Sequence, residues 1–140
     1  MLKLPSALLT IVCALAFSST LLLGCKKEPS LVGKWEGAAQ GQNAILEFKD
    51  DKTVSIEIQV ASATITLSGD YKLDGKNFSM TLKKADKKNV PAQLAPIIDQ
   101  GLKSALNKET KSTVEFNTED EVTMTSNGKT EKLTRVKPKA

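Results

Sequence analysis

The sequence predicts an all-β domain: an eight-stranded antiparallel up-and-down barrel with one inserted α-helix. Three observations support this fold class. Apolar and polar residues alternate along most of the chain after residue 30, short turn sequences separate the alternating runs, and a single segment shows a 3.6-residue apolar repeat. The composition agrees with it, because 40% hydrophobic and 26% charged residues are typical of a globular protein.

The alternation is clearest from Thr53 to Val60, where every second residue is valine or isoleucine and the residues between them are polar. It continues in the run from 63 to 73. A strand with one apolar and one polar face is typical of an antiparallel sheet that is covered on one side. We expect eight strands, at residues 31–38, 44–49, 53–60, 63–73, 77–84, 112–117, 121–126 and 129–136.

The connections between these runs have the sequences of tight turns. Asp74-Gly75 and Asn127-Gly128 tolerate a positive φ, so they suit hairpins, and Asp50-Asp51-Lys52 is a further short polar turn. Strands that follow one another in sequence are therefore expected to be neighbours in the sheet. An eight-stranded meander of this kind closes into an up-and-down barrel.

One segment interrupts the strand pattern. Between Pro91 and Lys108 the apolar residues fall on one arc of a helix, and Pro96 suits its first turn, so we expect a helix at 96–107 between the fifth and sixth strands. The face formed by Ile97, Ile98 and Leu102 is expected to pack on the barrel. The pattern leaves open whether the helix covers the open end of the barrel or its outer wall.

The first 25 residues predict a bacterial signal peptide. Lys3 provides a positive start, residues 8–23 are mostly apolar, and Leu22-Leu23-Gly24-Cys25 resembles a lipobox. This resemblance implies a signal peptide at 1–24, a lipidated Cys25 with acyl chains such as palmitate, a tether at 25–30 and a barrel domain at 31–137. The alternative is an N-terminal anchor helix that is not cleaved.

Two acyl chains give stable membrane anchoring. Lys26 follows the cysteine, where an aspartate would favour retention in the inner membrane. We therefore expect a location in the bacterial cell envelope, on the outer membrane facing the periplasm if the source is Gram-negative.

The sequence shows little sign of a catalytic site or a metal-binding site. The chain has no histidine, which excludes histidine-based catalysis and His-ligated metals. Glu119, Asp120 and Glu121 cluster at an expected turn without the spacing of a calcium loop. We therefore expect no enzyme activity, no cofactor and no metal site.

The basic run at residues 83–88 fits either a solvated loop before the helix or a contact with anionic lipid headgroups. No aromatic residues interleave with its lysines, so we expect no nucleic-acid partner.

A family resemblance appears at the ends of the predicted strands. Gly33-Lys34-Trp35 opens the first strand and Arg135 ends the last one, with Trp35 and Arg135 both expected to point inward. This combination resembles the lipocalin (calycin) signature, and the chain is similar to small bacterial lipocalin-like lipoproteins, many of which have no assigned function. The resemblance implies that Trp35 plugs the closed end of the barrel and that Arg135 packs over it. The chain departs from the lipocalin pattern in having its helix inside the barrel sequence and none after the last strand.

The inward-facing residues lead to two functional hypotheses. The first is non-enzymatic binding of a small apolar or amphiphilic ligand in the mouth of the barrel. The second is a barrel with a solid core that contacts another envelope protein. The expected ligand-lining side chains are Phe48, Ile56, Ile58, Leu67, Tyr71, Phe78, Met80, Phe116 and Met124.

Overall fold

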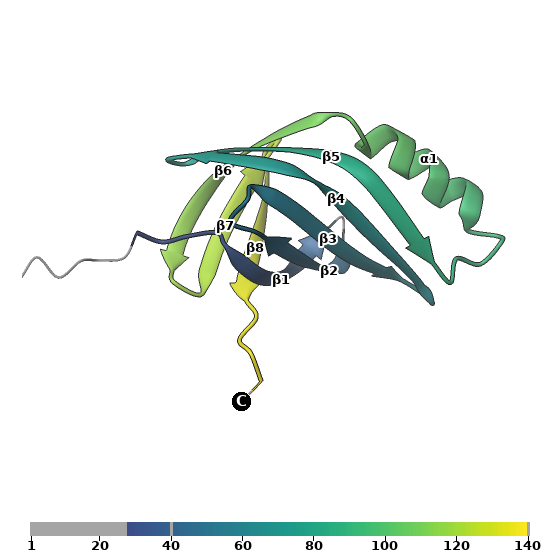
Figure 1. The fold of residues 1–140 in the computed structure, drawn as a ribbon, viewed down its shortest axis with the longest axis horizontal. Coiled ribbons are helices and arrows are strands. Elements are labelled where there is room, and N and C mark those ends of the chain that lie inside the picture. The colour runs from purple at the N-terminus through teal and green to yellow at the C-terminus, as the bar shows by residue number, and fades with distance from the viewer. Residues whose placement is uncertain (1–27, 40, 140) are drawn as a thin grey trace, which may run out of the picture.

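The computed structural model describes residues 28–39 and 41–139 and shows a barrel flanked by one helix (Figure 1). The predicted signal peptide at 1–24 and the predicted lipidation site Cys25 lie outside the described residues. No helix of the described part has the length and the apolar character needed to cross a bilayer.

The eight strands form one closed antiparallel barrel in which each strand pairs with its neighbours in sequence and β1 pairs with β8. The predicted fold class is therefore confirmed, including a helix between β5 and β6. The elements are β1 (Gly33–Ala39), β2 (Gln42–Phe48), β3 (Thr53–Val60), β4 (Ala63–Asp74), β5 (Asn77–Lys88), α1 (Ala95–Ala105), β6 (Glu109–Thr118), β7 (Glu121–Ser126) and β8 (Lys129–Arg135).

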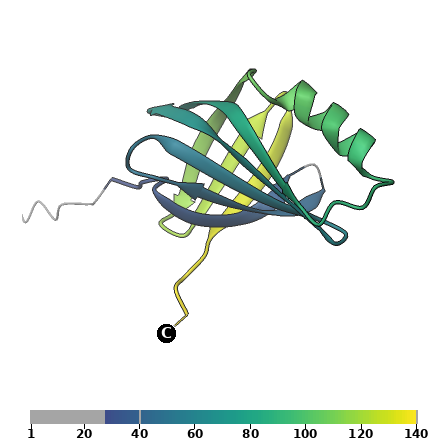
Figure 2. The ribbon, with the colours of Figure 1, turned by 45° about the vertical axis from the view of Figure 1, so that its right-hand side comes forward.

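The two ends of the barrel differ in the connections they carry. The closed end holds the start of β1, the end of β8 and the turns around residues 49–52, 75–76 and 119–120. The opposite end, which we call the mouth, holds the β3–β4 and β7–β8 turns and the connection from β5 through α1 to β6. Both the described N-terminal segment and the C-terminal segment leave from the closed end (Figure 2).

The basic run at 83–88 is part of a strand, so its interpretation as a loop was wrong. β5 continues to Lys88, and its residues pair with β4 as far as Lys88 opposite Thr64. A bulge made this hard to predict. The register shifts between Ser68 and Gly69, where Gly69 lies opposite Leu82 while Ser68 lies opposite Lys84. Lys83 is the extra residue, and it breaks the simple alternation that would have extended the strand.

Helix α1 fills a gap between two strands. β6 pairs with β5 only up to Thr81 opposite Glu109, so the mouth half of β5 has no β6 partner. The helix runs back along this half: Asp99, in the middle of α1, pairs with Lys87, and after the end of the helix the Asn107 N–H donates to the Leu82 carbonyl at 2.7 Å. Figures 1 and 2 both place α1 alongside β5 at the mouth.

The bulge requires a residue without a side chain at position 69. A β-carbon built on Gly69 would lie 2.7 Å from Leu82 Cα and 2.8 Å from Thr81 C, and neither backbone atom can move aside cheaply. Gly69→Ala is therefore expected to lower the free energy of unfolding by about 2–4 kcal/mol, within the range of severe single substitutions.

Gly101 provides a matched control in the full chain. Nothing lies within 4 Å of a β-carbon built there, and the residue is inside α1. Gly101→Ala should raise the free energy of unfolding by about 0.5–1 kcal/mol through helix propensity. Urea unfolding followed by circular dichroism compares the two variants, and equal stability of Gly69→Ala and wild type would contradict the proposed constraint.

Candidate functional site

The closed end of the barrel is sealed around Trp35, which is fully buried. The indole Nε1–H donates to the Leu31 carbonyl at 2.6 Å, so the only polar atom of the side chain has a partner inside the seal. The Arg135 guanidinium lies over the indole, with Cζ 4.2 Å from the ring centroid. The two residues are also directly paired between β1 and β8. This geometry combines cation–π attraction with the closure of the barrel.

Arg135 also connects three segments of backbone through charge-assisted hydrogen bonds. Its Nη2 donates to the Ser30 carbonyl and its Nη1 to the Val32 carbonyl, each at 2.8 Å, and its Nε donates to the Glu119 carbonyl at 3.1 Å. The guanidinium thereby links the segment before β1, the β6–β7 turn and the end of β8. Because Arg135 presents several donors in a fixed plane, lysine would not reproduce this set of contacts.

Gly33 completes the closure. Its φ is 126°, a region that L-residues rarely adopt, and a β-carbon there would lie 2.6 Å from Arg135 Nη1. The structure therefore brings Gly33, Trp35 and Arg135 together, as their positions in the sequence predicted.

Next to this seal, three aromatic side chains fill the barrel interior. The centroid of Phe48 lies 5.0 Å from that of Tyr71 and 5.9 Å from that of Phe78, both in edge-on geometry. The Tyr71 hydroxyl donates to the Lys49 carbonyl at 3.0 Å. Burial raises the pKa of Tyr71, so the phenol keeps its proton and its donor role at neutral pH.

The side chains expected to line a ligand separate into two groups. Phe48, Tyr71 and Phe78 are 1–3% exposed, and Ile56 and Leu67 are 6% exposed, so these five belong to the packed core. The second group, which is partly exposed, comprises Ile58, Met80, Phe116 and Met124.

Two of the partly exposed residues, Ile58 and Met124, are on the mouth half of their strands. Val60, Ala85 and the helix residues Ile98 and Leu102 are partly buried there as well. The other two, Met80 and Phe116, are on the closed-end half of their strands, and Ala44 and Ala63 toward the mouth are 1% exposed, so partly accessible interior side chains occur toward both ends of the barrel.

The helix contributes an incompletely buried apolar face to the mouth. Ile98, Leu102 and Leu106 pack against the core, but no residue of α1 is fully buried. Ile97 is 69% exposed, so its expected place on the docking face was wrong. The sequence placed Ile97 and Ile98 on one broad arc, and packing against the core selects the Ile98 side of that arc.

A single ion pair joins α1 to the strand beside it. The Lys87 ammonium contacts the Asp99 carboxylate, with 35% and 47% of the side chains exposed. An ion pair with this exposure stabilises a contact by about 0–1 kcal/mol. The sequence pattern does not indicate this pair, because the alternation predicts no strand at Lys87.

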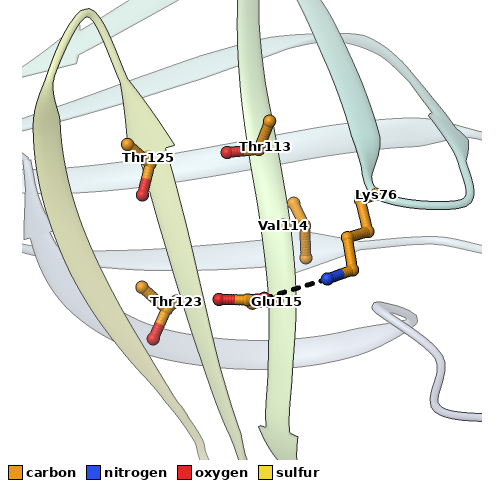
Figure 3. A pocket seen from close by; sticks show the side chains of 6 residues that line it. All are labelled: Lys76, Thr113, Val114, Glu115, Thr123 and Thr125. Atoms are coloured by element: carbon orange, nitrogen blue, oxygen red, sulfur yellow. Dashed lines mark hydrogen bonds and ion pairs between the residues drawn. The ribbon is translucent and has the colours of Figure 1, made fainter.

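Two hollows lie at the surface of the barrel. One, of about 240 Å³, lies over β6 and β7 beside Lys76, which pairs with Glu115 at 2.9 Å (Figure 3). The other, of about 600 Å³, lies along β4 and β5 and contains the Lys83–Asp70 ion pair. Most residues around both hollows are polar or charged, but Tyr71, Leu73 and Met80 add apolar surface to the larger one, and two of these, Tyr71 and Met80, were expected to line a ligand. Among the described residues, no group of three or more Asp, Glu, Cys or His side chains could hold a metal ion.

Removing the closed-end contacts should destabilise the domain in a coupled way. Arg135→Ala is expected to lower the free energy of unfolding by about 1–3 kcal/mol, because three carbonyls lose their charged donor and the buried indole loses its cation–π contact. Trp35→Ala should cost about 3–5 kcal/mol through the cavity it leaves. The double variant should lose less than the sum, since each change removes the same contact.

Lys132→Ala provides the control, because this exposed lysine of β8 makes only a surface pair with Glu121. Its effect should stay within about 0–1 kcal/mol. Urea unfolding of the full chain followed by circular dichroism measures all four variants. Full additivity of the Trp35 and Arg135 losses would contradict the contact.

Comparison with known proteins supports the fold and goes no further. No family model matches the chain, and no curated protein sequence matches it. The solved structure of a lipocalin-like protein from Bacteroides uniformis superposes with a TM-score of 0.53 at 16% identity, covering 76% of this chain and 98% of that one. An uncharacterized protein from Bacteroides eggerthii superposes with a TM-score of 0.51 at 17% identity, covering 76% and 100%. The chain therefore has the lipocalin-like fold that its Gly33, Trp35 and Arg135 positions predicted.

Proposed function

We propose that this protein is a lipid-anchored protein of the bacterial cell envelope whose barrel binds a small apolar or amphiphilic molecule at the mouth, without catalysing a reaction. The observation that carries the proposal is the set of partly accessible apolar side chains that face the interior toward the mouth. Interior side chains at the closed end, such as Trp35 and Phe48, are 0–1% exposed, whereas Ile58, Val60 and Met124 toward the mouth stay partly accessible. A lipocalin-like barrel is compatible with such a ligand-binding role.

The alternative is a solid barrel that contacts another envelope protein through its outer surface. A contact of this kind favours a contiguous apolar patch. In the part of the chain that the structure describes, the large exposed hydrophobic residues are Ile45, Ile97 and Val136. They belong to β2, to α1 and to the segment after β8, so they come from three separate elements. This distribution favours the ligand-binding proposal.

Anchoring through Cys25 would also orient the barrel. Ser30 is held at the closed end by Arg135, and five peptide units separate it from Cys25. An extended chain spans at most about 3.3–3.6 Å per residue, so the closed end would stay within about 17 Å of the lipid. The mouth would then point away from the membrane, toward an aqueous compartment such as the periplasm from which a ligand arrives.

Replacement of the predicted lipidation site tests the anchor. Cys25→Ser should abolish incorporation of radioactive palmitate and leave an unprocessed precursor, because only a cysteine thiol accepts the diacylglyceryl group at a lipobox. Lys26→Ser is the control and should keep the label. Equal labelling of Cys25→Ser and the wild type would refute lipidation at this residue.

The two interior methionines offer a direct test of ligand binding. Met80 and Met124 are both partly exposed, and Met1 is the third methionine of the chain. In NMR spectra of the full chain, labelled with ¹³C at the methionine methyl groups and held in phosphatidylcholine nanodiscs, 1-octanol should shift the Met124 methyl signal saturably. The Trp35 indole signal at the closed end should stay in place. If no methionine signal shifts saturably with 1-octanol or octanoate, the binding proposal is wrong.

A further inference from the structure

We propose that α1 is a displaceable cover over the binding site, and that the ligand is a single-chain amphiphile whose anionic head takes the place of Asp99 on Lys87. This inference rests on the proposed binding function, and it adds the position of the site and the chemical class of the ligand.

The first step concerns the direction of Lys87. Lys87 lies opposite Ile65 on β4, and residues directly opposite one another in a ladder share a face of the sheet. Ile65 is 6% exposed and belongs to the core, so Lys87 is on the inward face at the mouth. Its neighbour Lys88 lies opposite Thr64 and is on the outer face.

The second step concerns the surface beside Lys87. Ala85 lies opposite Leu67, and both pack in or against the core on the same inward face. This wall has no β6 strand beside it, and α1, which is joined to it by the Lys87–Asp99 pair, packs Ile98 and Leu102 against the core. An acyl chain offers the same kind of apolar surface that the helix now provides. The ligand tail and the helix face would therefore compete for one wall.

The third step concerns how firmly the helix is held. All of its apolar contacts are partly exposed, and its one ion pair to the strands is with Lys87. Regions with few buried contacts open at low free-energy cost compared with the core of the same domain. When α1 moves away, Asp99 leaves with it, and the Lys87 ammonium remains at the edge of an apolar wall. A carboxylate or phosphate head then restores a charge-assisted hydrogen bond to it.

The charges on the inward faces of the strands at the mouth agree with an anionic head. Strand register places Lys87, Lys129 and Glu131 there. Glu131 lies opposite Met124, which packs against the core, and Lys129 lies two residues before Glu131 on the same face of β8, opposite Ser126. Two positive charges and one negative charge remain once Asp99 is displaced. A cationic head group would instead face the unpaired Lys87.

The test compares head groups on a common eight-carbon tail. Octanoate, 1-octanol and octyltrimethylammonium are titrated into the full chain in nanodiscs, with the Met124 methyl signal as the readout and empty nanodiscs as the partition control. Octanoate should reach half-saturation at a concentration about two- to fivefold lower than 1-octanol, as expected for an ion pair with a partly exposed ammonium. Octyltrimethylammonium should bind more weakly than 1-octanol.

Three variants assign this preference to Lys87. Lys87→Met keeps most of the aliphatic stem and should abolish the preference for octanoate over 1-octanol. Lys88→Met removes an equal charge from the outer face. It should leave the half-saturation concentrations (the midpoints) of octanoate and 1-octanol unchanged. Asp99→Asn frees Lys87 and loosens the helix, so it should lower the octanoate midpoint several-fold. Hydrogen exchange of α1 amides should accelerate when octanoate saturates the wild type.

Several results would overturn the inference while leaving the proposed function in place. Equal midpoints for octanoate and 1-octanol would exclude a specific anionic head group. A preference that survives in Lys87→Met would place the head elsewhere. Slower exchange of α1 on binding would show that the helix stays over the ligand. If Lys87→Met does not fold, the Asp99→Asn variant decides alone. A higher half-saturation concentration of octanoate in Asp99→Asn would show that the ligand head does not replace Asp99 on Lys87. Absence of a saturable shift with all three compounds would instead reject the binding function itself.

Discussion

The contact between Arg135 and Trp35 is the interaction on which the closed barrel depends. The ladder between β1 and β8 contains two paired positions, Trp35 with Arg135 and Glu36 with Thr134, whereas β4 and β5 are paired along eleven positions. A barrel without this closure would expose two strand edges. The guanidinium compensates for the short ladder by stacking on the indole and by holding the carbonyls of Ser30, Val32 and Glu119. Side chains therefore complete the closure that the backbone leaves short.

A second seam, between β5 and β6, is closed by different means. β5 is longer than its partner, and α1 covers the part of β5 that β6 does not reach. The first seam buries its central side chain fully, while no residue of α1 is fully buried. The two seams therefore differ in how easily they open. The seam at Trp35 holds the barrel closed, and the seam at α1 is the one that the proposed ligand would open.

Local sequence patterns determine which way a strand residue points, but not how far along the barrel axis it lies. The parity of Trp35 and Arg135 was sufficient to place both inward, and β3 and β7 have the bounds that alternation predicted. The same reasoning grouped Phe48 with Met124 as ligand-lining, although the first is in the packed core and the second is near the mouth. The level of a residue follows from strand register and stagger, which are properties of the whole sheet. The exposed position of Ile97 likewise depends on tertiary contact.

The bulge at Gly69 shows how strand register shapes the candidate site. Without it, strict alternation from the inward Leu82 would turn Lys84, Asp86 and Lys88 toward the interior. The extra residue, Lys83, reverses the parity, so Ala85 and Lys87 face inward and the three charged residues face solvent. The wall beneath α1 is apolar for this reason, and Lys87 is beside Asp99 for the same reason. A glycine in the middle of β4 thus determines both the surface that the helix covers and the single charge at its edge.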